Sequence, residues 1–256
     1  MGWKDVFSYT KALAANQGVR ADDKLPLGAR IGSLVQMQVS PIIRAQSGGS
    51  LIAMPADGDT RIVAASQVKI APNTSLYRLY LVTGDANADE KFLQVFNNDD
   101  GSVAEILYCT QLARVIPETE DDQDAYTGVA GYGLGDASYT LWREQLADTL
   151  GAAELAAAFG DDDQITFARD AGAPDAAFVA PFTGNEIRID DSQGMKGLKQ
   201  QLYFMPYVRE LAGGGREYLL ITTEIIDSVD GDTSKRGIHV DFVIAIPIEQ
   251  QRITVQ

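Results

Sequence analysis

The first sixteen residues carry apolar side chains at helical spacing, which predicts an amphipathic amino-terminal helix. The apolar stripe consists of Trp3, Val6, Phe7 and Leu13. A polar run over residues 18–24 follows, so we assign 1–24 to an amino-terminal segment and linker. A helix this short is marginal by itself, and its stripe must dock either on its own domain or on a partner. The four residues are therefore our candidates for partner binding.

From residue 25 to residue 117 the pattern of apolar and polar positions has the period of β-strands. Tyr77, Leu79 and Leu81 alternate with Arg78 and Tyr80, as on a strand with two different faces. Polar and glycine-containing turns separate several such runs, which is typical of hairpins. This part of the chain is predicted to form a mostly antiparallel sheet.

An acidic and then glycine-rich stretch leads to the strongest helical pattern in the interior of the chain. Trp142, Leu146 and Leu150 lie four residues apart, and Gly160 provides a stop signal. These positions predict a central helix over residues 137–159.

Residues 161–256 return to strand patterns with glycine, proline and aspartate between them. In the last long run, His239 and Asp241 share one face, and the aliphatic residues of the other face are predicted to be buried. We interpret the His239 face as facing solvent. The predicted class is α+β: one domain over 25–256, with β-rich halves 25–117 and 161–256 around the central helix.

Charge and hydropathy narrow the function classes. The 256 residues include 36 Asp and Glu against 21 Lys and Arg, a net charge of −15. Such a chain repels phosphate backbones and anionic lipid surfaces, so we expect no nucleic-acid partner. No run approaches the roughly 20 apolar residues of a transmembrane segment, and the amino terminus lacks a secretory signal pattern. A cytoplasmic protein is the simplest interpretation.

The chain has one cysteine, Cys109, and one histidine, His239. A single cysteine excludes an intramolecular disulfide, and its apolar surroundings indicate a buried, unreactive thiol. We expect no cofactor and no stoichiometric transition metal, because zinc sites usually need several histidines or cysteines. His239 and Asp241 could form a hydrogen-bonded pair that activates water, so they are the candidate catalytic residues. No nucleophile motif accompanies them.

Short motifs in a fixed order resemble the bacterial YjfK-like family, a domain of unknown function. They lie at residues 25–28 (LPLG), 92–94 (FLQ), 142–144 (WRE), 205–209 (MPYVR), 217–220 (EYLL) and 246–248 (IPI), with the Tyr77 and Tyr80 strand among them. The resemblance covers the chain from about residue 25 to the carboxyl end. The family has no established activity, so it implies no catalytic residues.

The same resemblance implies a cellular context. Similar proteins tend to be encoded beside a coiled-coil protein of the phage-shock (PspA-like) type and small membrane proteins. This association suggests an accessory role in membrane stress, peripheral to the inner membrane through a protein partner.

Three hypotheses follow from the sequence. The first is a non-enzymatic interaction protein whose partner is a membrane-associated coiled-coil protein. The second is an enzyme whose site combines His239, Asp241 and scattered carboxylates, for which a cleft lined by perturbed titratable groups would be the sign. The third is a small-ligand binding module, which predicts a closed apolar pocket with few polar groups.

Overall fold

The computed structural model describes residues 20–56, 60–70, 74–83, 89–228 and 237–256. Its strands are β1 (Leu34–Met37), β2 (Thr60–Ile70), β3 (Thr74–Leu81), β4 (Lys91–Asn97), β5 (Val103–Val115), β6 (Ser138–Trp142), β7 (Gln164–Arg169), β8 (Phe182–Ile189), β9 (Gly197–Glu210), β10 (Arg216–Ser228), β11 (Gly237–Pro247) and β12 (Ile253–Val255). The α-helices are α2 (Ser40–Ser47), α3 (Glu120–Thr127) and α4 (Ala152–Phe159), and the 3₁₀ helices are η1 (Pro26–Gly28), η2 (Arg143–Leu146) and η4 (Gln250–Arg252).

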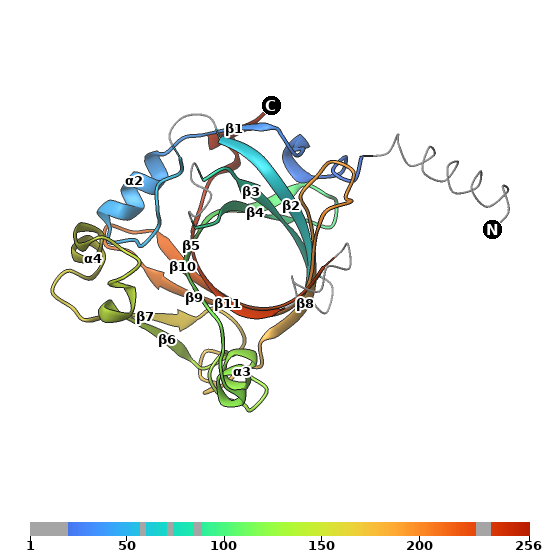
Figure 1. Cartoon of the computed structure of the whole chain (residues 1–256). Coiled ribbons are helices and arrows are strands. Elements are labelled where there is room, and N and C mark those ends of the chain that lie inside the picture. The colour runs from blue at the N-terminus through green and yellow to red at the C-terminus, as the bar shows by residue number, and fades with distance from the viewer. Residues whose placement is uncertain (1–19, 57–59, 71–73, 84–88, 229–236) are drawn as a thin grey trace, which may run out of the picture.

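Eight strands close into an antiparallel barrel. The order around the ring is β2, β3, β4, β5, β11, β10, β9 and β8, and β8 pairs with β2 to close it. Figure 1 looks down this ring. Closure leaves the ring strands without a free edge, so every strand of the wall is paired on both sides.

The other four strands extend the wall outside the ring. β1 continues the sheet from β2 and pairs with β12, while β7 continues it from β9 and pairs with β6. Helices α2 and α4 lie together outside the ring, beside these extensions (Figure 1). The largest apolar cluster packs the outer face of the barrel against them, with Ile42, Phe159, Phe167, Tyr207 and Leu219 among its buried members.

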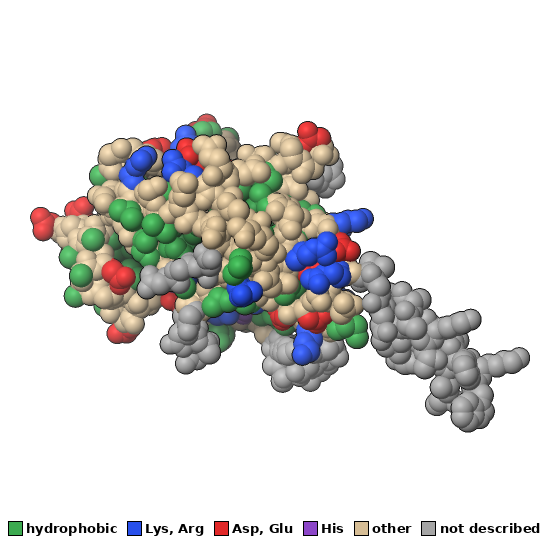
Figure 2. All heavy atoms as spheres, turned by 90° about the horizontal axis from the view of Figure 1, so that it is seen from above, with side chains coloured by type: hydrophobic (Ala, Val, Ile, Leu, Met, Phe, Trp, Pro, Cys, Tyr) green, Lys and Arg blue, Asp and Glu red, His purple; other side chains and the backbone are tan. Residues whose placement is uncertain are grey.

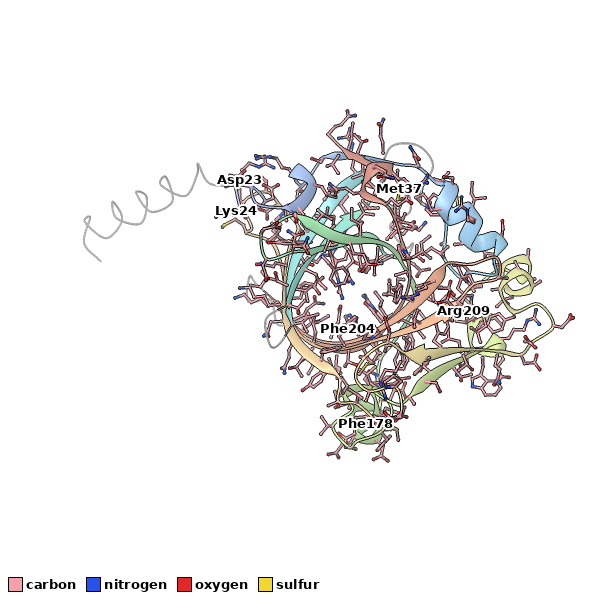
Figure 3. The ribbon with its side chains drawn as sticks, turned by 180° about the vertical axis from the view of Figure 1, so that it is seen from behind. Asp23, Lys24, Met37, Phe178, Phe204 and Arg209 are labelled. Carbon is pink, nitrogen blue, oxygen red and sulfur yellow. The ribbon has the colours of Figure 1, made fainter. Side chains whose placement is uncertain are left out.

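The inner face of the barrel is distinct from this outer core. Arg78 of β3 contacts Glu224 of β10, although the two strands are four positions apart in the ring, so the contact crosses the lumen. Side chains project into the ring from its wall (Figure 3). Two smaller apolar clusters fill part of this interior. Their buried members are Ala64, Tyr80, Phe92, Leu107, Cys109, Leu220, Val243 and Ala245 in one, and Val68, Leu76 and Leu202 in the other.

The predicted α+β class with a central helix is wrong, because the fold is mostly β. Residues 137–159 divide into strand β6, the 3₁₀ helix η2 and the short helix α4. Tyr139 points toward the barrel wall, where its ring packs on Tyr207 and Phe242. This packing and the pairing of β6 with β7 outweigh the local helical spacing. The two β-rich halves join in one ring, since β5 pairs with β11 and β2 with β8.

The end of the expected linker contacts the barrel domain. Ala21 donates a backbone hydrogen bond to Ser192, and the buried Asp22 carboxylate accepts bonds from Arg20 and the Ile31 amide. The apolar stripe of Trp3, Val6, Phe7 and Leu13 lies outside the described residues.

In the described part of the chain, no helix combines the length and hydropathy needed to cross a membrane. On the face shown in Figure 2, acidic and basic side chains are interspersed rather than segregated.

Candidate functional site

One end of the barrel lumen contains a cavity of about 350 Å³. This volume lies in the range of about 300–1,000 Å³ that is common for small-molecule sites. Seven of the eight ring strands contribute to its wall. The lining side chains on these strands include Arg78, Tyr80, Phe92, Arg114, Arg188, Leu198, Gln200, Thr222, Glu224, His239, Asp241 and Val243. Because small eight-stranded barrels are either filled by side chains or hold one ligand, this unfilled end is the candidate site.

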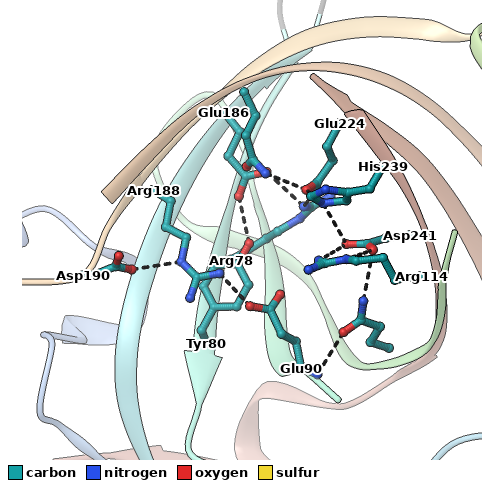
Figure 4. A network of polar contacts seen from close by, with 12 residues as sticks. Arg78, Tyr80, Glu90, Arg114, Glu186, Arg188, Asp190, Glu224, His239 and Asp241 are labelled. Atoms are coloured by element: carbon teal, nitrogen blue, oxygen red, sulfur yellow. Dashed lines mark hydrogen bonds and ion pairs between the residues drawn. The ribbon is translucent and has the colours of Figure 1, made fainter. Parts of the chain in front are cut away.

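At the inner end of the cavity, a buried arginine is paired with two carboxylates (Figure 4). Arg78 Nη1 lies 3.0 Å from Glu186 Oε2 and 3.5 Å from Glu224 Oε1. The Tyr80 hydroxyl donates to Glu186 Oε1 at 2.9 Å. Burial, together with the Glu186 charge, raises the pKa of Tyr80 well above its usual value, so the phenol remains a donor. The arginine charge is thus compensated by two carboxylates of the protein.

His239 joins this group from the neighbouring strand. Its Nε2 lies 2.8 Å from Glu224 Oε2 and 4.0 Å from Asp241 Oδ2. Glu224 Oε2 also accepts a bond from Gln200 Nε2 at 2.5 Å. Burial raises the pKa of Glu224 above its usual value, although the hydrogen bond to His239 acts in the opposite direction. A buried carboxyl with a shifted pKa in a cavity is a common property of functional sites.

Two further arginines hold carboxylates toward the open end of the cavity. Arg114 forms a bidentate ion pair with Asp241. Its Nε donates to Oδ1 at 2.6 Å and its Nη2 to Oδ2 at 2.7 Å. Arg188 bonds Glu90 at 2.7 Å and Asp190 at 3.0 Å. Its guanidinium also stacks on the Tyr80 ring, 4.0 Å from the ring centroid. Positive and negative groups therefore alternate around the cavity (Figure 4).

Three buried polar groups in the lumen lack a partner among the described residues. They are Gln200 Oε1, Gln94 Nε2 and Ser66 Oγ. Ser66 and Gln94 stand opposite Arg78 in the two strand registers, so they share its inward face. Leaving such a group unpaired costs about 1–3 kcal/mol. Of the three residues, Gln200 lines the cavity, so a polar molecule there would satisfy its oxygen.

The structure brings together His239 and Asp241, the candidate catalytic residues, at this cavity. Their expected exposure to solvent is wrong, because only 12% of the His239 and 8% of the Asp241 side chain is accessible. Barrel closure turns this polar strand face inward. Tyr80 and Thr222 supply the only hydroxyls among the described lining residues, and Tyr80 is already bonded to Glu186. No serine or cysteine nucleophile stands beside His239 in this lining.

Sequence reasoning missed several residues of the site, namely Arg78, Arg114, Glu186, Arg188, Gln200 and Glu224. The signal that could have found them is a charged or amide residue inside an otherwise apolar strand. Glu224, for example, follows a run of aliphatic and threonine residues and is followed by two isoleucines. A charge in that setting is rarely tolerated unless a partner compensates it.

Cys109 is buried in the apolar part of the lumen, as predicted. Burial also raises the pKa of its thiol, which leaves it in the unreactive protonated form.

Comparison with known protein families, curated proteins and solved structures finds no match for this chain.

Proposed function

We propose that this protein binds a small polar molecule without net charge in the barrel lumen, and that it acts as a binding protein rather than an enzyme. The observation that carries the proposal is the cavity of about 350 Å³ beside Gln200, whose buried Oε1 has no partner among the described residues. Small eight-stranded barrels can hold one ligand in the lumen, where a small number of polar groups fix its orientation.

The charges in the wall define the class of ligand. Three arginines and four carboxylates line the cavity: Arg78, Arg114, Arg188, Glu90, Asp190, Glu224 and Asp241. An anion such as phosphate would meet the carboxylates, and a simple cation of organic size would meet the arginines. A zwitterion such as a free amino acid, or a polyhydroxy compound, can match both. The sequence-based ligand hypothesis expected an apolar pocket, and the cavity differs in being polar.

Binding is better supported than catalysis because the charged side chains that line the cavity are paired with one another. Arg114 occupies both oxygens of Asp241, and Glu224 is held by His239, Gln200 and Arg78. General acid–base catalysis needs a group within reach of substrate that can exchange its proton. Preorganised ion pairs instead favour orientation of a ligand by hydrogen bonds.

The interaction with a protein partner through Trp3, Val6, Phe7 and Leu13 is a separate proposal. It rests on the sequence pattern of the amino-terminal segment and on the YjfK-like resemblance. A cytoplasmic location peripheral to the inner membrane belongs to the same proposal. Capture of the partner by the full chain, and its loss after deletion of residues 1–19, is the corresponding test.

Thermal-shift and native mass-spectrometry measurements test the lumen proposal, using a panel of free amino acids, polyols, monosaccharides, dicarboxylates and phosphate. Leu198→Trp places a large ring in the cavity, because Leu198 lines it. Ile187→Trp is the matched control on the outer face, where Ile187 is exposed. An uncharged or zwitterionic compound should stabilise the wild-type chain and the control but not Leu198→Trp. Equal binding to Leu198→Trp, or no binding across the panel, contradicts the proposal.

A further inference from the structure

Three potential metal ligands meet on two adjacent strands of the lumen. His239 and Asp241 are two residues apart on β11, and Glu224 of β10 stands directly opposite His239 in the register. One ligand atom from each of the three lies within 4.8 Å of the other two. This arrangement follows from strand alternation and pairing, so the rigid barrel wall holds all three groups.

The distances between the ligand atoms suit a shared ion. His239 Nε2 lies 2.8 Å from a Glu224 oxygen and 4.0 Å from an Asp241 oxygen. Two ligands of one tetrahedral ion with bonds near 2.0–2.1 Å are about 3.3 Å apart. The two measured distances bracket that value, and shifts of less than about 1 Å would create the coordination geometry.

We propose that Glu224, His239 and Asp241 bind a first-row divalent metal ion such as Zn²⁺ or Mn²⁺. One imidazole and two carboxylates form a mixed donor set that suits these ions, whereas Mg²⁺ and Ca²⁺ favour oxygen alone. The site lies in the lumen cavity, but it requires no organic ligand. This proposal differs from the sequence-based expectation of no metal. That expectation considered only histidine and cysteine as ligands, whereas the fold places two carboxylates beside His239.

The surrounding contacts orient both carboxylates. Asp241 is held by Arg114 and by Gln111 Nε2 at 3.0 Å, and Glu224 by Gln200 and Arg78. Hydrogen-bonded carboxylates of this kind are typical around metal ligands. Each carboxylate has about four lone-pair positions, so an arginine and an ion can share it.

Carboxyl groups outnumber guanidinium groups around the three proposed ligands. Around His239 lie the carboxylates of Glu186, Glu224 and Asp241 and the guanidinium groups of Arg78 and Arg114. This set has three carboxyl groups and two guanidinium groups. A divalent ion offsets that excess in a region that water screens weakly.

The buried Gln200 amide, which also supports the lumen proposal, indicates a ligand near these three residues. Its side chain is buried, with 7% exposed, and its Oε1 has no partner among the described residues. The Nε2 of the same amide bonds Glu224, so the amide lies beside one of the three ligands. A water molecule on the ion could donate to its Oε1.

Isothermal titration calorimetry with Zn²⁺ and with Mn²⁺ tests the proposal on the full chain after EDTA treatment and dialysis. The wild-type chain should bind one Zn²⁺ ion in the cavity. His239→Gln, and separately Asp241→Asn, should weaken that binding at least tenfold. Asp162→Asn, in an exposed acidic loop, should leave it unchanged. Circular dichroism of each variant verifies folding. Affinity that His239→Gln leaves unchanged, or that Asp162→Asn alone removes, overturns the site.

A second measurement requires no variant. His239 is the only histidine, so its imidazole gives a single set of NMR signals. Substoichiometric Mn²⁺ should broaden these signals selectively, and Zn²⁺ should shift them, whereas Mg²⁺ should do neither. Signals that stay unchanged with both transition ions overturn the proposal. Because no organic compound is present, this outcome is independent of the ligand panel, and failure of the panel leaves the metal result unaffected.

Discussion

Single residues show why a polar strand face is found inside this molecule. Alternation assigned His239 and Asp241 to one face of a strand, but a period of two is the same whether that face points to solvent or into a barrel. The decisive residues are Arg78 and Glu224, whose contact across the lumen neutralises charges that could not be buried alone. A pairwise contact of this kind between distant strands leaves no local signal in the sequence.

His239 provides the first prediction. Replacement by Ala removes the hydrogen bond to the buried Glu224 and should lower the free energy of unfolding by about 1–3 kcal/mol. Urea denaturation in EDTA measures this loss without a metal contribution. Lys199→Ala, at an exposed position of β9, is the control and should stay within about 0.5 kcal/mol of wild type. An equally small effect of His239→Ala would mean that the imidazole is not buried as described.

Cys109 provides the second prediction. Its side chain has no accessible surface, and burial raises the pKa of the thiol. The folded chain should therefore not react with a thiol reagent such as DTNB at pH 8, and one equivalent should react after unfolding in guanidinium. Rapid reaction of the native chain would show that the apolar part of the lumen opens to solvent.

At the scale of elements, several strands were predicted correctly and the central helix was wrong. The alternation around Tyr80 and around Val240 is present as β3 and β11. The spacing of Trp142, Leu146 and Leu150 resembled a helix, yet β6 occupies the start of that region because β7 offers it a partner. Such pairing brings distant segments together, and local spacing contains no information about it.

Another buried charge group joins the loop after α2 to the β9–β10 hairpin. Glu217 is fully buried; it accepts bonds from Arg209, from the Leu51 amide and from the Ser50 hydroxyl. Glu217→Ala should cost about 3–5 kcal/mol, because it leaves Arg209 without its carboxylate. Glu210 pairs with Arg216 on the same hairpin but is exposed, and Glu210→Ala should cost less than about 1 kcal/mol. Chemical denaturation of both variants measures the contrast.

For the whole molecule, closure of the barrel creates both the buried wall and the cavity. Strand β8 completes the ring by pairing with β9 and β2. Gly197 of β9 lies so close to β8 that a Cβ added to Gly197 would be 1.9 Å from the Arg188 carbonyl oxygen. The positive φ of 145° at Gly197 also disfavours other residues. The sequence showed this position only as one glycine among 24. Ring closure was therefore not predictable from the local pattern.

Gly197→Ala should consequently destabilise the fold strongly, by more than about 3 kcal/mol, since backbone has to move apart between β8 and β9. Gly237→Ala is the matched control, because an added Cβ there would meet nothing within 4 Å. Thermal melts followed by circular dichroism should show a large decrease of the melting temperature for the first variant alone. Equal stability of the two variants would be incompatible with this approach of β8 to β9.

The central claim is that the lumen cavity binds a small polar molecule without net charge, and the imidazole of His239 reports on it directly. A ¹H–¹⁵N spectrum of the histidine-labelled, metal-free chain can be recorded with each compound of the panel. The account predicts that an uncharged or zwitterionic compound shifts the His239 signals saturably in the wild-type chain and in Ile187→Trp, but not in Leu198→Trp. Signals that no compound shifts, or that shift equally in Leu198→Trp, would contradict it.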